Sequence, residues 1–124
     1  MQTSQPGTWP EASGTCPVGP VVDVVLSRWT TPILWTLNFR GRQRFLELQQ
    51  GIPGISPKVL TDSLRRLERD GLVSRAYHRE VPPRVEYEIT ELGATLAPLF
   101  AHLATWGTEH LGAVEQARLA YDAS

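Results

Sequence analysis

The sequence predicts a mainly α-helical domain that carries one small β-hairpin, in the order α-α-α-α-β-β-α. Apolar residues recur at helical spacing along most of residues 16–110, whereas residues 73–89 alternate apolar and polar positions, as strands do. Glycines and prolines lie between these segments. With 124 residues, 41% of them hydrophobic, the chain can bury one modest core, so a single domain is expected.

Two short helices are expected first. Residues 1–15 are rich in Gly, Pro, Ser and Thr without a period, which predicts a flexible N-terminal arm. The first helix follows from the helical spacing of Val18, Val21, Val22, Val25 and Leu26. In the second, "WTTPILWTLNF", Thr30 or Thr31 is the expected cap and Pro32 fits the first turn.

The next two helices form the centre of the domain. "RFLELQQ" predicts a brief third helix that ends before "GIPG". For the fourth helix, Ser56 is the expected cap, Pro57 its first residue and Gly71 the residue that stops it. A helical turn of about 100° per residue gives this helix an apolar face of leucines and a charged face. The apolar face consists of Leu60, Leu64 and Leu67, and the charged face consists of Lys58, Asp62, Arg65 and Arg69.

Two strands and a long helix complete the order. Alternation predicts strands over residues 73–77 and 85–89, joined by the loop "HREVPPR", which its prolines stiffen. Thr90 is the expected cap of a long helix that Pro98 is expected to bend. Its apolar stripe consists of Leu92, Leu96, Leu99, Leu103 and Trp106. The predicted domain spans residues 16–110 and is followed by a weaker helical tail, residues 111–124.

Positive charge is concentrated in the middle of the chain. The formal net charge is −1, but eleven of the twelve Lys and Arg residues lie between Arg28 and Arg84. Only five acids lie in that stretch, which gives it a net charge of +6. Such a basic centre is typical of a domain that binds a polyanion.

The predicted order of elements is that of a winged helix-turn-helix domain. The major groove of B-DNA is about 12 Å wide and accepts one helix, so the charged face of the fourth helix could contact base edges. Basic groups on the hairpin and after the second helix could contact phosphates or a minor groove. The predicted DNA-binding residues are Arg42, Arg44, Ser56, Lys58, Thr61, Asp62, Arg65, Arg66, Arg79 and Arg84, with Arg40 and His78 beside them. The base-reading candidates are Lys58, Thr61, Asp62 and Arg65.

Two alternatives stay open. Amphipathic helices often have charged solvent faces, and Asp62 could simply pair with Arg65 or Arg66 at helical spacing. For the whole protein, the alternative is a winged-helix module that binds a small molecule or another protein and does not bind DNA.

Three segments carry motifs that are specific to one family. They are "TCPVGPVVDVVLSRWTTPILWTL", "QRFLELQQGIPGISPKVLTDSLRRLERDGLVSR" and "EVPPRVEYEITELGATLAPLFAHLATWGTEH". They closely resemble the HxlR-type branch of bacterial winged-helix transcription regulators, which are relatives of the MarR group. The chain departs from the usual pattern at Ser27-Arg28, where Gly-Lys is common, and at Leu46, where glycine is common.

The resemblance implies a homodimer that is held together by its terminal helices and binds a two-fold DNA operator to regulate nearby genes. Such regulators often respond to electrophiles, oxidants or small molecules. A two-fold dimer would place two recognition helices about 34 Å apart, one turn of DNA. An apolar stripe can also be plain core. The predicted interface residues are Val21, Val25, Leu99, Leu103 and Trp106.

Two features could receive a signal. Cys16, the only cysteine, precedes Pro17 at the start of the first helix, where the helix dipole favours the reactive thiolate. The resemblance implies that a cysteine at this position is a thiol switch in some members, although a small residue could also simply pack there. Separately, Trp29, Trp35 and Trp106 could line a small-molecule pocket between subunits or pack in the core.

Other chemistry has little support. The three histidines, His78, His102 and His110, are scattered, and no nucleophile elbow, phosphate loop or paired-carboxylate centre occurs. No enzyme activity, metal or cofactor is therefore predicted. No apolar stretch is long enough to cross a bilayer and the first residues lack a secretion signal, so a cytoplasmic protein without a membrane partner is expected.

Overall fold

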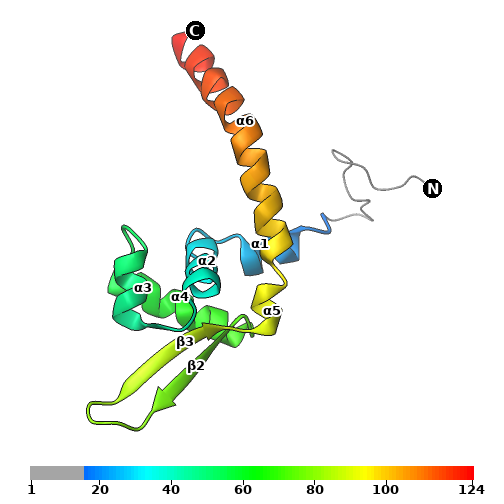
Figure 1. Cartoon of the computed structure of the whole chain (residues 1–124). Helices are drawn as coiled ribbons and strands as arrows, with labels where there is room; N and C mark the ends of the chain where they lie inside the picture. The colour runs from blue at the N-terminus through cyan, green and yellow to red at the C-terminus, as the bar shows by residue number, and fades with distance from the viewer. Residues whose placement is uncertain (1–15) are drawn as a thin grey trace, which may run out of the picture.

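The computed structural model describes residues 16–124, so the predicted arm over residues 1–15 lies outside the described residues. The described chain is mainly helical and carries one small antiparallel sheet (Figure 1). In chain order the elements are α1 (Gly19–Val25), α2 (Thr30–Arg40), β1 (Gln43–Arg44), α3 (Phe45–Gly51), α4 (Pro57–Arg69), β2 (Val73–His78), β3 (Arg84–Ile89), α5 (Glu91–Ala94) and α6 (Ala97–Ala123). The predicted mainly α fold with a hairpin is confirmed.

One hydrophobic core lies between α2, α3, α4 and the base of the sheet. Helices α2 and α4 contribute the side chains that their apolar spacing predicted, and α3 contributes Leu48, whereas Leu46 is 65% exposed. The segments before and after α4 contribute two residues each. The core residues are Ile33, Leu34, Leu37, Leu48, Ile52, Ile55, Leu60, Leu64, Leu67, Leu72 and Val73. This core holds α4 on the domain by one face only.

Both ends of α4 are capped as predicted. The hydroxyl of Ser56 accepts a hydrogen bond from the backbone N–H of Val59 at 3.1 Å. At the other end, Gly71 has a φ of +79°, in the left-handed region. The backbone N–H of Leu72 donates to the carbonyl of Leu67 at 2.9 Å, and the N–H of Gly71 donates to the carbonyl of Glu68 at 3.0 Å, which together form a Schellman motif.

The sheet has a strand that the sequence did not predict. Strands β2 and β3 form the expected hairpin, in which Val73 lies opposite Ile89 and His78 lies opposite Arg84. The two-residue strand β1 adds to the other edge of β3, which gives the order β1-β3-β2 with antiparallel pairing throughout. The stretch "RGRQ" shows no alternation in the sequence that would predict a strand. In the structure its last residue, Gln43, begins β1 and pairs with Tyr87.

The predicted long helix after Thr90 is two helices. Thr90 caps α5 as expected, since its hydroxyl accepts from the N–H of Gly93 at 3.0 Å, but α5 ends after four residues. The expectation that Pro98 bends a continuous helix is therefore wrong. Pro98 lies in the first turn of α6, where its missing N–H costs nothing.

The start of α2 also differs in detail. The helix begins at Thr30, and its N-cap is Trp29 without a side-chain cap, so neither Thr30 nor Thr31 is the cap. The hydroxyl of Thr30 is instead 2.6 Å from the hydroxyl of Ser27. Pro32 lies in the first turn, as predicted.

Helix α6 extends away from the rest of the domain, on the side opposite the hairpin (Figure 1). It is 27 residues long, passes through position 110 without a break, and contains no buried residue. No helix among residues 16–124 is long and apolar enough to span a membrane.

Candidate nucleic-acid interface

Helix α4 presents a charged face on the side away from the core. Its buried residues are Leu60, Ser63, Leu64 and Leu67. At about 100° per residue, the side chains directly opposite are Lys58, Asp62, Arg65 and Arg69, as the sequence predicted. The only addition to the predicted buried face is Ser63.

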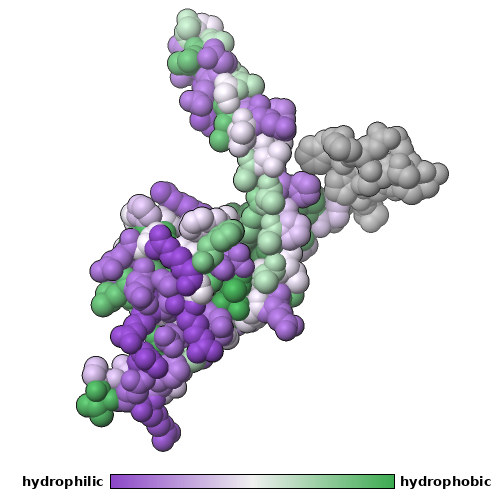
Figure 2. Space-filling model, viewed as in Figure 1, coloured by the Kyte–Doolittle hydropathy of each residue, from purple (hydrophilic) through white to green (hydrophobic). Residues whose placement is uncertain are grey.

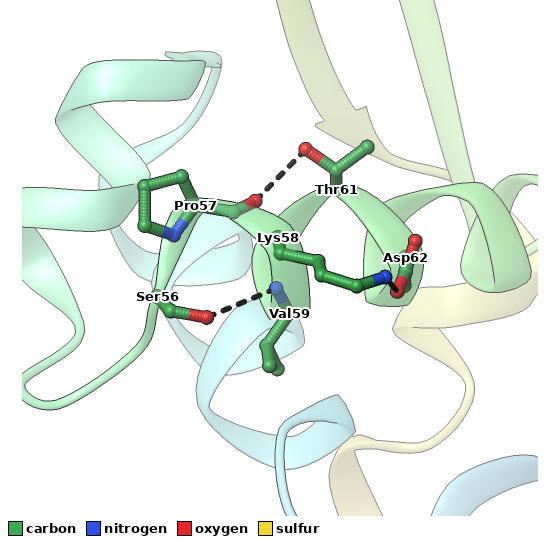
Figure 3. A network of polar contacts seen from close by, with 6 residues as sticks. All are labelled: Ser56, Pro57, Lys58, Val59, Thr61 and Asp62. Atoms are coloured by element: carbon green, nitrogen blue, oxygen red, sulfur yellow. Dashed lines mark hydrogen bonds and ion pairs between the residues drawn. The ribbon is translucent and has the colours of Figure 1, made fainter.

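The first turns of α4 carry a small polar network (Figure 3). The ammonium of Lys58 lies 3.0 Å from Asp62 Oδ2, and both side chains are exposed. The hydroxyl of Thr61 donates to the carbonyl of Pro57 at 2.9 Å, which leaves its methyl group free. Ser56 is exposed at the N-terminus of the helix. This end of α4 therefore offers an ammonium, a carboxylate, a methyl group and the positive end of a helix dipole.

Three arginines of α4 carry unneutralised charge. Arg65, Arg66 and Arg69 are exposed, and no ion pair among residues 16–124 includes any of them. The alternative in which Asp62 pairs with Arg65 or Arg66 is wrong, because the partner of Asp62 is Lys58. Arg69 was not among the predicted DNA-binding residues, although its position one helical turn after Arg65 could have indicated that it lies on the same face.

The hairpin is less basic than its loop sequence suggests. His78 Nε2 lies 2.8 Å from Glu86 Oε1, and Arg84 Nη2 lies 2.9 Å from Glu80 Oε2. Arg79 is exposed at the start of the loop and belongs to no ion pair within the described residues. Of the three basic groups of the hairpin tip, Arg79 is therefore the one with an uncompensated charge.

The basic residues after α2 have mixed surroundings. Arg42 Nε lies 3.4 Å from Glu88 Oε2 on the adjacent strand. Arg44 is exposed at the N-cap of α3, and its backbone N–H donates to Glu47 Oε1 at 2.8 Å, so its guanidinium is not needed as a cap. Arg40 is exposed at the last turn of α2. Arg40 and Arg44 thus belong to no ion pair within residues 16–124, whereas Arg42 does.

A polar cluster joins α4 to the hairpin. Arg75 Nε of β2 lies 3.7 Å from Glu68 Oε2 of α4. Burial raises the pKa of the neighbouring Tyr87 in β3, and Glu68 acts in the same direction, whereas Arg75 opposes the shift. The cluster therefore links α4 to the hairpin through one ion pair.

The predicted dimer residues have different environments. Val25 is only 4% exposed and is covered by its own chain, whereas Val21 is exposed. On α6, Leu99 is half-buried, Leu103 is 44% exposed and Trp106 is 52% exposed. The stripe on α6 and Val21 thus have surface to offer a partner, and Val25 does not.

The two candidate signal sites are an exposed thiol and three tryptophans in different environments. Cys16 is an exposed free thiol that lies two residues before Val18, the N-cap of α1. Of the three tryptophans, Trp35 lines a cavity beside α6, Trp29 packs against the core, and Trp106 lies exposed on α6. Among residues 16–124, no cluster of His, Cys, Asp and Glu side chains could hold a metal ion.

Comparison with known proteins identifies one family. The family of HxlR-like helix-turn-helix proteins matches residues 24–115. The HTH-type transcriptional regulator YdeP of Bacillus subtilis (strain 168) is 39% identical over 110 residues, which cover 86% of this chain and 85% of YdeP. The crystal structure of the HTH-type transcriptional regulator YtcD is similar with a TM-score of 0.73 at 37% identity, over 79% of this chain and 99% of YtcD. The redox regulator HypR in its reduced form is similar with a TM-score of 0.71 at 38% identity, over 81% of this chain and 98% of HypR.

Proposed function

Because this chain belongs to the HxlR-like helix-turn-helix family, we propose that it is a transcription regulator that binds a two-fold DNA operator as a homodimer. In this proposal, α4 enters the major groove and the hairpin follows the adjacent backbone. The separate possibility of a winged-helix module that does not bind DNA remains the competing function.

The observation that carries the proposal is the outer face of α4. A helix that is held by leucines on one side presents Lys58, Arg65 and Arg69 in one line on the other. Arginine can donate two hydrogen bonds to guanine, and lysine can donate one, so this line suits direct contact with base edges or phosphates. Thr61 adds a free methyl group, which suits contact with a thymine methyl.

The surrounding basic groups suit phosphate contacts. Arg79 on the hairpin and Arg44 beside α3 are exposed. Phosphate contacts position a protein on the duplex without reading its sequence. Arg42 and Arg84 are paired with carboxylates. The Arg42–Glu88 pair is exposed and therefore weak enough to exchange its acid for a phosphate, whereas Arg84 is half-buried.

A salt titration of DNA binding tests the function. We expect the affinity for operator DNA to fall linearly with salt on logarithmic axes, with a slope of about −0.9 for each phosphate neutralised. Arg65→Ala should cost about 1 to 3 kcal/mol on the operator and relax the preference at one base pair. Arg79→Ala should weaken operator and random DNA alike and reduce the slope by about one.

Arg118→Ala is the matched control for these variants, because Arg118 is an exposed arginine near the far end of α6. It removes the same charge but should leave both affinities unchanged. If the unaltered protein forms no complex with fragments of its own genome, the DNA-binding function is wrong. If Arg65→Ala and Arg79→Ala both bind operator and random DNA like the parent, the roles given to these two residues are wrong.

A signal that acts through oxidation is a second part of the proposal. The solved relative HypR is a redox regulator, and Cys16 is an exposed thiol in this chain. With no second cysteine in the sequence, an oxidant can convert Cys16 to a disulfide with the other subunit or to a mixed disulfide with a small thiol, and an electrophile can alkylate it without oxidation.

A further inference from the structure

Lys58 is the only lysine in the sequence. The other eleven of the twelve Lys and Arg residues are arginines. Hydrophilic residues gather over the body of the domain and along the hairpin (Figure 2), and Lys58 contributes the one side-chain primary amine among them. An arginine guanidinium stays protonated at any pH that a protein meets, so it is a poor nucleophile. Chemistry that acts on amines therefore has one side-chain target in this sequence.

The amine of Lys58 is open to a reagent in solution. Its side chain is 83% exposed, and its one ion pair within residues 16–124 is with Asp62, whose Oδ2 lies 3.0 Å from Nζ (Figure 3). An ion pair between exposed side chains is weak, so the amine can leave Asp62 and meet a reagent. Arg65 and Arg69 lie within about 60° of Lys58 around α4 and carry unneutralised charge, so they attract an anionic reagent to the same face.

We propose that Lys58 is an acylation site that takes its acyl group from an activated donor, either an acyl phosphate or an acyl thioester. The ammonium first gives one proton to water. The electron pair on Nζ then attacks the acyl carbon, and a carbon–nitrogen bond forms while the bond from that carbon to the phosphate oxygen or the thiol sulfur breaks. The leaving group takes the electron pair of the broken bond, and the nitrogen gives a second proton to water. The product is a neutral amide.

Acylation changes two charges on the outer face of α4. The amide is neutral, so Lys58 can no longer act as a cation toward a phosphate or a guanine. Asp62 loses its partner, and its carboxylate then stands as an unneutralised negative charge beside Arg65. A phosphate backbone repels that carboxylate. Acylation of Lys58 therefore weakens DNA binding. This regulatory role rests on the proposed function, whereas the modification itself does not.

Incubation of the full-length protein with acetyl phosphate, and separately with acetyl-coenzyme A, tests the site. We expect intact-mass measurement and peptide mapping to find one acetyl group on Lys58 with at least one of the two donors. The arm that gives the product identifies the donor as a phosphate or a thioester. If neither donor acetylates Lys58 of the folded protein, the modification site is wrong.

Operator binding by the acetylated protein is the regulatory readout. We expect acetylation to lower the operator affinity of the parent by about tenfold or more, and to reduce the salt slope by about one, because one cation is lost. Lys58→Arg is the matched control, because it keeps the charge and lacks the amine, so the same treatment should leave its own affinity unchanged. Asp62→Asn has no carboxylate to uncover, so acetylation should lower its affinity by a smaller factor than in the parent.

The possible failures are distinguishable. An equal loss of affinity in treated parent and treated Lys58→Arg would mean that another group causes the loss, which refutes regulation through Lys58. Acetylated Lys58 with unchanged operator affinity also refutes regulation and keeps the modification site. If the untreated parent binds no DNA, the proposed function fails and the regulatory role fails with it, while the mass measurement still decides whether Lys58 is acylated.

Discussion

Some basic side chains would have to leave a carboxylate partner before they could contact DNA, and others would not. Lys58, Arg42 and Arg84 each lie against a carboxylate, while Arg65 and Arg79 do not. Exposed pairs contribute about 0 to 1 kcal/mol each, so a phosphate can displace the acid at little cost. Unpaired arginines should therefore dominate affinity, and paired ones should contribute mainly when the DNA backbone approaches them.

The sequence could predict the basic face but not this pairing. Lys58 and Asp62 are four positions apart on one helix, a spacing at which pairing can be foreseen. Arg42 and Glu88 are far apart in the sequence and meet only because β1 pairs with β3. Contacts of this kind depend on strand register, which composition and periodicity do not give.

Tyr87 predicts how stability changes at alkaline pH. Burial raises its pKa above the ordinary value of 10.0, so the folded protein binds the phenolic proton more tightly than the unfolded chain does. The stabilisation is complete below the unfolded pKa and is lost as the pH rises through the folded pKa. Urea unfolding at a series of pH values should show that Tyr87→Phe loses less stability above about pH 10 than the parent does.

Tyr77→Phe is the matched control for this prediction. Tyr77 lies on the same hairpin but is exposed, so its removal should leave the alkaline loss of stability as it is in the parent. If the free energy of unfolding fell equally with pH in the parent and in Tyr87→Phe, Tyr87 would not be the cause of the loss of stability at alkaline pH.

Cys16 gives a residue-scale prediction for the signal. We expect diamide or a quinone to lower operator affinity of the parent and to leave Cys16→Ser unaffected, because the chain has no other thiol. Titration of operator binding with and without the oxidant measures the effect, and non-reducing electrophoresis distinguishes a cross-subunit disulfide from the other products. An equal loss of binding in both proteins would exclude the thiol from the response.

At the scale of the elements, periodicity predicted the segments with strong local signals. The caps Ser56 and Thr90 and the stop at Gly71 are where the sequence put them, because each is a contact between residues close in the chain. The short strand β1 was missed because two residues carry no periodicity. The break between α5 and α6 was missed because the leucine spacing continues across it and gives no sign of the turn.

The junction between α5 and the sheet predicts the effect of one added methyl group. A Cβ on Gly93 would lie 2.8 Å from Ile89 Cγ1 and would collide with the carbonyl oxygen of Leu72. That carbonyl accepts the N–H of Thr90 at 3.1 Å, so it cannot move away without breaking a backbone hydrogen bond. Gly93→Ala should lower the free energy of unfolding by about 1 to 3 kcal/mol, measured by urea denaturation.

Gly112→Ala separates this steric effect from helix propensity. Gly112 lies inside α6, and an added Cβ there meets no other atom within 4 Å. Alanine should therefore leave the fold unchanged or stabilise the helix, by up to about 1 kcal/mol. If Gly93→Ala were as stable as Gly112→Ala, the close approach of α5 to the sheet would be wrong.

At the scale of the whole molecule, the domain is compact around α2, α3 and α4, but α6 projects from it (Figure 1). A helix of 27 residues is about 40 Å long. Most helical stability in proteins comes from packing of an apolar face, and α6 has no buried residue within its own chain. The exposed side chains on it include Leu103 and Trp106, so this helix requires a partner surface that covers them.

A second copy of the chain is the partner that the proposed function needs, since one α4 on each subunit would read one half of a two-fold operator. We expect Leu103→Glu and Trp106→Glu to convert the dimer to a monomer in sedimentation, because each places a charge in the apolar contact. Operator affinity should then fall by about a hundredfold or more, since the second half-site no longer binds as part of one molecule.

Thr108→Glu is the matched control, because it adds the same charge on the opposite side of α6 and should leave a dimer. The near-ultraviolet circular dichroism should stay unchanged in Leu103→Glu and Thr108→Glu, because these positions carry no aromatic chromophore and the core of α2, α3 and α4 does not include them. Parent protein that sediments as a monomer while binding its operator tightly would rule out the dimer arm.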